Sequence, residues 1–169
     1  FTLVQEPGIY RVSVPGLEAS APFEIRPAVH AEVARGALKA FYHHRVPVPT
    51  LAEYAGEWAR PAGHPDDHVE IHPSAASASR PAGSFISAPG GWYDAGDYNK
   101  YVVNSGITTG TLLSLLEDLP AAAAALDTQI PESGDEVPDL LDETLWNLRW
   151  MLSMQDPEDG GVYHKLTTA

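Results

Sequence analysis

The sequence of 169 residues contains no cysteine. This absence excludes disulfide bonds and thiolate metal sites. Without cysteines, the sequence does not indicate whether the protein works in an oxidising or a reducing compartment. Basic residues are also scarce, because 10 lysines and arginines stand against 23 aspartates and glutamates, giving a formal net charge of −13 at pH 7. A chain this acidic repels nucleic acid and anionic membrane surfaces. We therefore expect neither as a partner.

Long hydrophobic runs are missing as well. No apolar stretch approaches the ~18 residues that indicate a membrane-spanning helix, and the run at residues 121–125 is too short and too weakly apolar. The composition, 44% hydrophobic and 20% charged, is that of a globular chain. No basic signal-peptide start follows Phe1, so we expect that Phe1 is not the biological N-terminus. The acidity suits a secreted or periplasmic protein that acts on a neutral or cationic polymer.

Residues 1–26 have the pattern of β-structure. Residues 8–14 alternate apolar and polar side chains, which predicts a half-buried strand, and residues 21–25 predict a second, shorter strand. Two strands alone cannot bury a core. We therefore interpret this segment as the closing strands of a β-sandwich.

The rest of the chain predicts helices separated by long loops. Apolar residues at helical spacing predict helices near residues 28–44, 104–119 and 138–155, and a continuation of the second over residues 121–126. In the third helix, Trp146 and Trp150 lie one turn apart on the same side. We interpret this pair as core residues rather than as a sugar-stacking pair.

An irregular, proline-rich region over residues 46–91 leads into the segment Gly90–Tyr101, which reads GGWYDAGDYNKY. An irregular segment of this length inside a globular chain is usually functional. Asp94 and Asp97 lie close together here, with aromatic residues on both sides. Carboxylates activate water or protonate a leaving oxygen, and aromatic rings stack on the apolar faces of sugars. Asp-Ala-Gly-Asp is also ordinary turn or metal-loop chemistry, so the pattern alone leaves both interpretations open.

Five segments in a fixed order along the chain carry a family resemblance. They are FYHHR at 41–45, YAGEWARP at 54–61, GGWYDAGDYNKY at 90–101, IPESGDEVPDLLDE at 130–143 and WMLSMQ at 150–155. In these segments the chain resembles the family-nine glycoside hydrolases, a group of inverting cellulases and related exo-acting enzymes. It is similar in particular to the subgroup in which an immunoglobulin-like domain precedes the catalytic domain.

The resemblance implies an all-α fold, an (α/α)6 barrel made of two rings of helices. Residues 27–169 then supply the first part of the barrel, which is incomplete in this chain. Residues 1–26 become the C-terminal strands of an immunoglobulin-like β-sandwich. We expect the remainder of the catalytic domain as a partner, for example as a second chain.

The resemblance also implies roles for individual residues. Asp97 is the catalytic base, and Asp94 helps it to hold the attacking water. The general acid of the family is a glutamate near the end of the catalytic domain, outside this chain, so we expect the chain by itself to be inactive. His164 resembles a family position that binds substrate near the cleaved bond, the alternative being an exposed loop histidine. The flanking rings of Trp92 and Tyr93 are further expected substrate contacts.

An oxygen-rich cluster leads into the third predicted helix. It consists of Glu132, Asp135, Asp139 and Asp142. Calcium takes about six to eight oxygen ligands in proteins, and family members resemble this loop in binding calcium. We expect a structural calcium ion here. The alternative is that Asp139 and Asp142 only favour the positive end of the helix dipole.

Zinc is not expected. Some relatives bind structural zinc through cysteines and histidines, and the corresponding cysteine positions are Val46 and Gly63 here. A tetrahedral zinc site without its thiolates is disfavoured. A group of nearby histidines and aspartates is the alternative candidate for a metal site. We interpret these side chains as solvated loop residues instead. These are His64, Asp66, Asp67, His68 and His72.

The expected function is an inverting glycoside hydrolase that cleaves β-1,4-linked glucan or glucosamine oligo- and polysaccharides. A strongly acidic cleft suits a cationic amino sugar. The alternative is a non-catalytic carbohydrate-binding or scaffold protein that reuses the fold. The presence of both Asp94 and Asp97 argues against that alternative, because a pure binding protein has no need of the pair.

Overall fold

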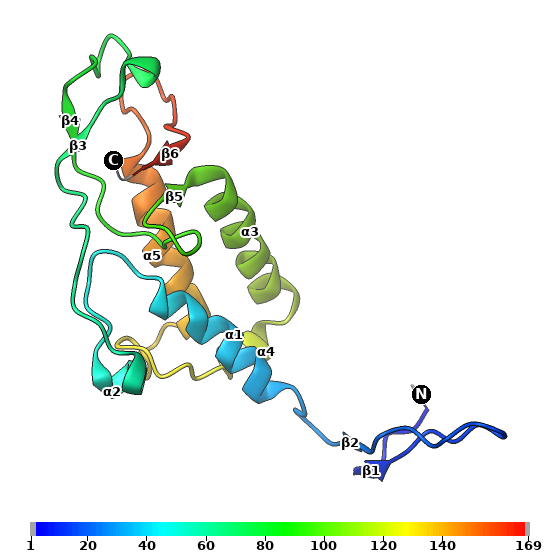
Figure 1. Ribbon diagram of the computed structural model, residues 1–169. Coiled ribbons are helices and arrows are strands. Elements are labelled where there is room, and N and C mark those ends of the chain that lie inside the picture. Colours follow the sequence, from blue (N-terminus) through cyan, green and yellow to red (C-terminus); the bar gives the residue numbers. More distant parts are fainter. Residues whose placement is uncertain (1–2, 168–169) are drawn as a thin grey trace.

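The computed structural model describes residues 3–167. Three long helices form its body: α1 (Ala31–His43), α3 (Val102–Asp118) and α5 (Asp139–Ser153). Helix α5 contacts α1, α3 and the short helix α4 (Pro120–Ala124), so it is the centre of the helical body (Figure 1).

The three helices predicted from the sequence are confirmed, with small shifts at their ends. Helix α1 begins later than expected, after Ala28, whose φ of +53° lies outside the helical region. Helix α3 stops before Leu119, because a residue that precedes a proline is disfavoured in the helical conformation. The expected continuation is therefore a separate helix, α4. Pro138 is extended, with ψ at 135°, and directly precedes α5.

The remaining elements after α1 are short. They are α2 (Ala52–Ala55), the 3-10 helices η1 (Gly56–Trp58) and η2 (Pro73–Ala75), and the antiparallel pairs β3 (Val69–Glu70) with β4 (Phe85–Ile86) and β5 (Lys100–Tyr101) with β6 (Lys165–Leu166). In the last pair, Lys100 lies opposite Leu166 and Tyr101 opposite Lys165. This pairing brings the C-terminal segment beside the strand that follows Asp97.

The N-terminal segment is a hairpin of β1 (Gly8–Tyr10) and β2 (Phe23–Ile25), in which Gly8 pairs with Ile25 and Tyr10 with Phe23. Both predicted strands are present but shorter than expected. Figure 1 shows the hairpin lying apart from the helices. Ile9 is 79% exposed because two strands have nothing to bury it against. The immunoglobulin-like assignment of residues 1–26 stays a prediction.

Helix α5 contributes to two of the three clusters of buried apolar side chains. The clusters are Ala88, Trp150, Met154 and Leu166; Leu38, Ala123 and Leu140; and Tyr42, Ala55 and Ile130. Trp150 is fully buried, which confirms its interpretation as a core residue. Within residues 3–167, we find no helix that is both long enough and apolar enough to cross a bilayer.

Candidate active site

Asp94 and Asp97 lie in the exposed part of one loop, residues 90–99, which ends at strand β5. We call this segment the acidic loop. Asn104, in the first turn of α3, donates from Nδ2 to Oδ1 of Asp94 at 2.8 Å. Asn99 holds Asp97 at both oxygens, with its backbone N–H 3.1 Å from Oδ1 and its side-chain amide 2.9 Å from Oδ2. The backbone N–H of Asp94 also donates to the carbonyl oxygen of Asn99 at 3.1 Å. The loop therefore presents both carboxylates to solvent in defined orientations, as the activation of a water molecule requires.

A group of aromatic rings stands beside the two carboxylates. Tyr98 is 53% exposed and stacks on His64, with ring centroids 4.0 Å apart. The ring of Tyr93 lies 5.3 Å from that of Tyr98 and 5.6 Å from the guanidinium of Arg60. Burial raises the pKa of the Tyr93 phenol, although the charge of Arg60 opposes the rise. The structure thus brings Tyr93 near the acids and adds Tyr98, a second ring that suits contact with a sugar.

Trp92 faces the interior instead. It is only 5% exposed, its ring centroid lies 4.6 Å from that of Phe41, and its indole N–H donates to Oε1 of Glu143 at 3.3 Å. Neighbouring residues of an extended segment point to opposite sides, so Trp92 is directed inward where Tyr93 is directed outward. This placement does not agree with the expected sugar contact, because it leaves the ring of Trp92 without an accessible face.

His164 is exposed and lies beside the strand pair that follows the acidic loop. Its carbonyl oxygen accepts from the backbone N–H of Val102 at 3.0 Å, and its ring lies 6.3 Å from that of Tyr101. Asn99, which holds Asp97, also donates to the hydroxyl of Tyr101 at 3.2 Å. A cavity of about 1030 Å³ adjoins His164 between residues 64–75 and 163–167. His164 therefore lies next to the predicted site although 67 positions separate it from Asp97 in the sequence.

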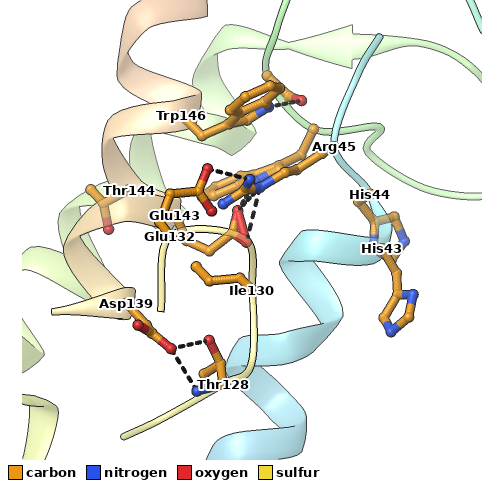
Figure 2. Close-up of polar contacts among 12 residues, drawn as sticks. His43, His44, Arg45, Thr128, Ile130, Glu132, Asp139, Glu143, Thr144 and Trp146 are labelled. Atoms are coloured by element: carbon orange, nitrogen blue, oxygen red, sulfur yellow. Dashed lines mark hydrogen bonds and ion pairs between the residues drawn. The ribbon is translucent and has the colours of Figure 1, made fainter. Parts of the chain in front are cut away.

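A buried ion-pair network lies beneath the acidic loop. Figure 2 shows Arg45 between the carboxylates of Glu132 and Glu143, with Trp146 on one side of its guanidinium. Nε of Arg45 is 2.9 Å from Glu143 and Nη1 is 2.9 Å from Glu132, while Arg45 and Glu143 are 2% and 0% exposed. Burial raises the pKa of Glu143, against the effect of the Arg45 charge. No sequence pattern indicates this network, because isolated charges in and after helices are typical of surface residues.

The network fixes the start of the acidic loop. Glu143 accepts the indole N–H of Trp92, and the indole N–H of Trp146 donates to the carbonyl oxygen of Gly91 at 3.0 Å. The backbone N–H of Val46 donates to the same carbonyl at 3.0 Å. Helix α5 and the segment after α1 therefore hold the residues that lead into Asp94.

Lys100 fixes the other end of the loop. Its ammonium is fully buried and lies 2.7 Å from Asp66, 3.1 Å from the carbonyl oxygen of Ala88 and 2.7 Å from that of Gly90. Burial lowers the pKa of Lys100, and its contact with Asp66 opposes this shift. The three partners match the three N–H donors of an ammonium. Asp66, expected as a solvated residue, is thus part of a buried ion pair that closes the neck of the loop.

Gly91 allows the loop to approach α5. Its φ is +79°, and a Cβ at this position would lie 2.8 Å from the ring of Trp150. We expect Gly91→Ala to lower the free energy of unfolding by about 2–4 kcal/mol, from backbone strain and overpacking together. Chemical denaturation measures the effect. Gly110→Ala is the matched control, because a methyl group added at Gly110 in α3 would meet no atom within 4 Å, and it is expected to be neutral or stabilising. Equal stability of the two variants would contradict this packing.

The acidic cluster before and in α5 (Glu132, Asp135, Asp139 and Asp142) meets some of the requirements of a calcium site. Oε2 of Glu132 and Oδ2 of Asp142 are buried without a hydrogen-bond partner. Burial, followed by the charges of Asp135, Glu132 and Asp139, raises the pKa of Asp142 to about 6. Crowded carboxylates with unpaired oxygens are the donor set that calcium takes. Within the described part of the chain, however, no three acidic or histidine side chains converge as closely as a metal site requires.

Asp139 accepts more hydrogen bonds than the other members of the cluster. Its Oδ2 accepts from the backbone N–H and hydroxyl of Thr128 at 2.6 and 2.7 Å, and from the hydroxyl of Ser133 at 2.7 Å (Figure 2 shows the contacts with Thr128). Asp139 therefore orders the loop that carries Glu132. Asp135 accepts the backbone N–H of Val137 at 2.6 Å.

Four of the five side chains considered as a replacement metal site have contacts of their own. His64 stacks on Tyr98 and Asp66 pairs with Lys100, as described above. The ring of His68 stacks on that of Phe85 with centroids 3.8 Å apart, and His72 accepts the backbone N–H of Ser74 at the start of η2. All five line the cavity beside His164, but within residues 3–167 no three such side chains converge closely enough to hold a metal ion.

Comparison with known proteins identifies the family of the chain. The family model of Glycosyl hydrolase family 9 matches residues 30–168. The chain is 54% identical to the xyloglucan-specific endo-beta-1,4-glucanase of Bacteroides ovatus over 168 residues, which are 99% of this chain and 28% of that protein. It is 33% identical to Endoglucanase D of Acetivibrio thermocellus over 170 residues, covering 99% of this chain and 26% of that protein.

Solved structures give the same result. A family-nine structure from Bacteroides ovatus has a TM-score of 0.87 at 53% identity, covering 99% of this chain and 30% of that one. A thermostable endoglucanase from Alicyclobacillus acidocaldarius has a TM-score of 0.81 at 32% identity, with 99% and 30% coverage. The chain spans less than a third of the length of these relatives. The family match and these likenesses, together with the acidic loop, lead to one conclusion: the chain belongs to glycosyl hydrolase family 9.

Proposed function

We propose that the protein carrying this chain is an inverting glycoside hydrolase acting on β-1,4-linked glucans. The observation that carries the proposal is the exposed loop in which Asp94 and Asp97 are each held by a different asparagine. The buried contacts of Arg45 and Lys100 support this loop from below. The relatives are named as endoglucanases and a xyloglucan-specific endoglucanase, which supports a β-glucan as the substrate. A buried network of this kind under a loop with solvent-exposed carboxylates is the arrangement expected of a preorganised site.

In the proposed reaction, Asp97 takes a proton from a water molecule that Asp94 helps to orient. The water attacks the anomeric carbon from the face opposite to the leaving group, so the configuration inverts. The general acid belongs about 6.5–9.5 Å away, across the sugar. We propose that it lies outside residues 1–169 and that this chain alone does not turn over substrate. Tyr93, Tyr98 and His164 are the proposed sugar contacts.

The remaining barrel is the proposed partner of the helices. Val33 of α1, Ile107 of α3 and Leu152 of α5 are 70%, 69% and 69% exposed, so each of the three long helices carries an apolar side chain that further packing would bury. Further helices of an (α/α)6 barrel would cover them. We also propose that residues 1–26 close an immunoglobulin-like domain, and that the protein acts outside the cytoplasm, where polymeric glucans are available.

The substrate is tested with a panel of polymers incubated with the protein that carries the complete catalytic domain. Release of reducing ends from unbranched β-1,4-glucan or xyloglucan, with none from glucosamine oligomers, is the expected result. Release from glucosamine oligomers alone would overturn the choice of substrate. Binding of glucans by calorimetry without any reducing ends released would favour the alternative, a carbohydrate-binding protein.

We propose that calcium binds at Glu132, Asp135 and Asp142 and stabilises the loop before α5. Calcium at 100-fold above its Kd should then raise the free energy of unfolding by about 2–3 kcal/mol relative to EDTA. Thermal unfolding in both buffers measures this. Asp142→Asn should remove the calcium response, and Asp118→Asn, at the exposed end of α3, should keep it. An equal response in the two variants would place calcium elsewhere.

Without calcium, the raised pKa of Asp142 gives a definite pH dependence. The folded chain binds this proton more tightly than the unfolded chain, so its contribution to stability is complete below pH 4 and is lost as the pH rises to 6. For a partly exposed group the expected loss is about 1–2 kcal/mol. The difference between the unfolding curves of the parent protein and Asp142→Asn in EDTA, from pH 4 to 7, isolates it. A difference that does not change with pH would contradict the prediction.

A further inference from the structure

We infer that Asn104 is a positioning residue, which fixes the Asp94 carboxylate from the first turn of α3. The inference rests on the proposed roles of Asp94 and Asp97. It adds a residue to which neither the family resemblance nor the acidic motif assigns a role. Asn104 lies outside the segment Gly90–Tyr101, on a different element of the structure.

The two acids of the loop are held in different ways. Both oxygens of Asp97 accept hydrogen bonds from Asn99, which belongs to the same loop. Asp94 accepts at Oδ1 from Asn104, which belongs to a helix. The contact with Asn104 therefore joins the loop tip to the helical body, and it leaves Oδ2 of Asp94 as the oxygen that can hold a water molecule.

Helix α3 is a suitable support for this contact. Its polar contacts with α5 begin one residue after Asn104, where the hydroxyl of Ser105 donates to Asn147 at 3.5 Å. Asn147 in turn donates to the hydroxyl of Thr109 at 3.2 Å. Asn104 itself is exposed, so its replacement removes the contact with Asp94 without opening a cavity in the core. The carboxylate orientation is thus set by a side chain whose own backbone is held rigidly.

The chemistry of the amide suits the role. An amide Nδ2 donates to an ionised carboxylate and stabilises that state, whereas a second carboxylate at the same distance repels it. The other charged or titratable groups near this loop include Asp97 itself, Arg60 over Tyr93, His64 against Tyr98, and Lys165 and His164 beside Tyr101. The buried pair of Lys100 and Asp66 lies at its neck. Asn104 is the α3 side chain with a hydrogen bond to a carboxylate of the loop.

Two variants of Asn104 test the inference in the protein that carries the complete catalytic domain. Asn104→Ala is expected to lower kcat about 10-fold with KM within about twofold, since the lost hydrogen bond orients a group of the reaction rather than binding substrate. Asn104→Asp is expected to lower kcat about 100-fold and to move the acidic limb of the kcat/KM profile to higher pH. Tm should stay within a few degrees for both. Ser114→Ala, exposed on the same helix, is the control that leaves rate and pH profile unchanged.

The outcomes separate this inference from the proposed function. If Asp94→Asn lowers kcat strongly while both Asn104 variants keep the parental rate and pH profile, the inference is wrong and the function stands. If Asp94→Asn has the parental kcat, the role of Asp94 fails and the inference fails with it. A loss of rate in Asn104→Asp that comes with a large fall in Tm and an unchanged pH profile would indicate a merely structural residue, and would also overturn the inference.

Discussion

Replacing Asp97 by asparagine is expected to lower kcat for β-1,4-glucan hydrolysis by about 10³-fold, because general-base catalysis typically contributes factors of 10²–10⁴. Asparagine keeps the size of the side chain and can accept one of the two hydrogen bonds from Asn99, but it cannot take the proton of the attacking water. KM should change little, since the base acts on water rather than on the sugar. Steady-state kinetics in the protein that carries the general acid measure the effect.

The matched control is Asp118→Asn, which removes an exposed carboxylate from the far end of α3 and should leave kcat unchanged. The kcat of Asp94→Asn should lie between those of Asp97→Asn and Asp118→Asn. A loss of about 10²-fold is expected if Asp94 orients the water without taking its proton. A parental kcat in Asp97→Asn would show that another group is the base. Azide rescue of the Asp97 variant, by an external nucleophile, would support the assignment.

Replacing Glu143 by leucine is expected to lower the free energy of unfolding by up to about 3–5 kcal/mol, the cost of removing one partner from a buried ion pair. Arg45 then faces Glu132 alone, and that side chain is 34% exposed. Arg45 is 2% exposed, so its guanidinium cannot regain water when Glu143 is removed. Trp92 loses the acceptor for its indole N–H at the same time. Chemical denaturation of the parent and variant measures the change, and a fall in kcat should accompany it because Trp92 leads into Asp94.

The double variant Arg45→Met with Glu143→Leu tests the reason for this loss. It removes both charges, so it should be more stable than Glu143→Leu alone. Glu117→Leu, an exposed position on α3, is the control for adding a leucine and should change stability by less than about 0.5 kcal/mol. A double variant less stable than either single variant would contradict a buried unpaired charge as the cause.

The helices and the position of the acidic loop were predictable from the sequence. Leu140 and Trp150 follow helical spacing because one side of α5 is buried, and this periodicity depends on neighbours close in the chain. Asp94 and Asp97 were recognisable for the same reason, since their pattern lies within a few residues. The prolines of residues 46–91 also predicted the irregular structure of that region, which contains only short helical turns and the strand pair β3 and β4.

The supports of the loop were not predictable, because each joins residues that are far apart in the sequence. Arg45 meets Glu143 across 98 positions, and Lys100 meets Asp66 from a strand too short to have a pattern. Charged residues are mostly exposed, so no local pattern indicated that these four form ion pairs in the interior. The inward direction of Trp92 was not predictable either, because the residues that bury it, Phe41 and Glu143, are far from it in the sequence.

The anomeric configuration of the first product tests the central claim most directly. The protein with its complete catalytic domain is mixed with a β-1,4-linked cello-oligosaccharide, and proton NMR spectra are recorded before mutarotation equilibrates the new reducing end. An inverting enzyme that uses Asp97 as a base must release the α-anomer first. Early appearance of the β-anomer would indicate a retaining mechanism, and would contradict the roles given to Asp97 and Asp94.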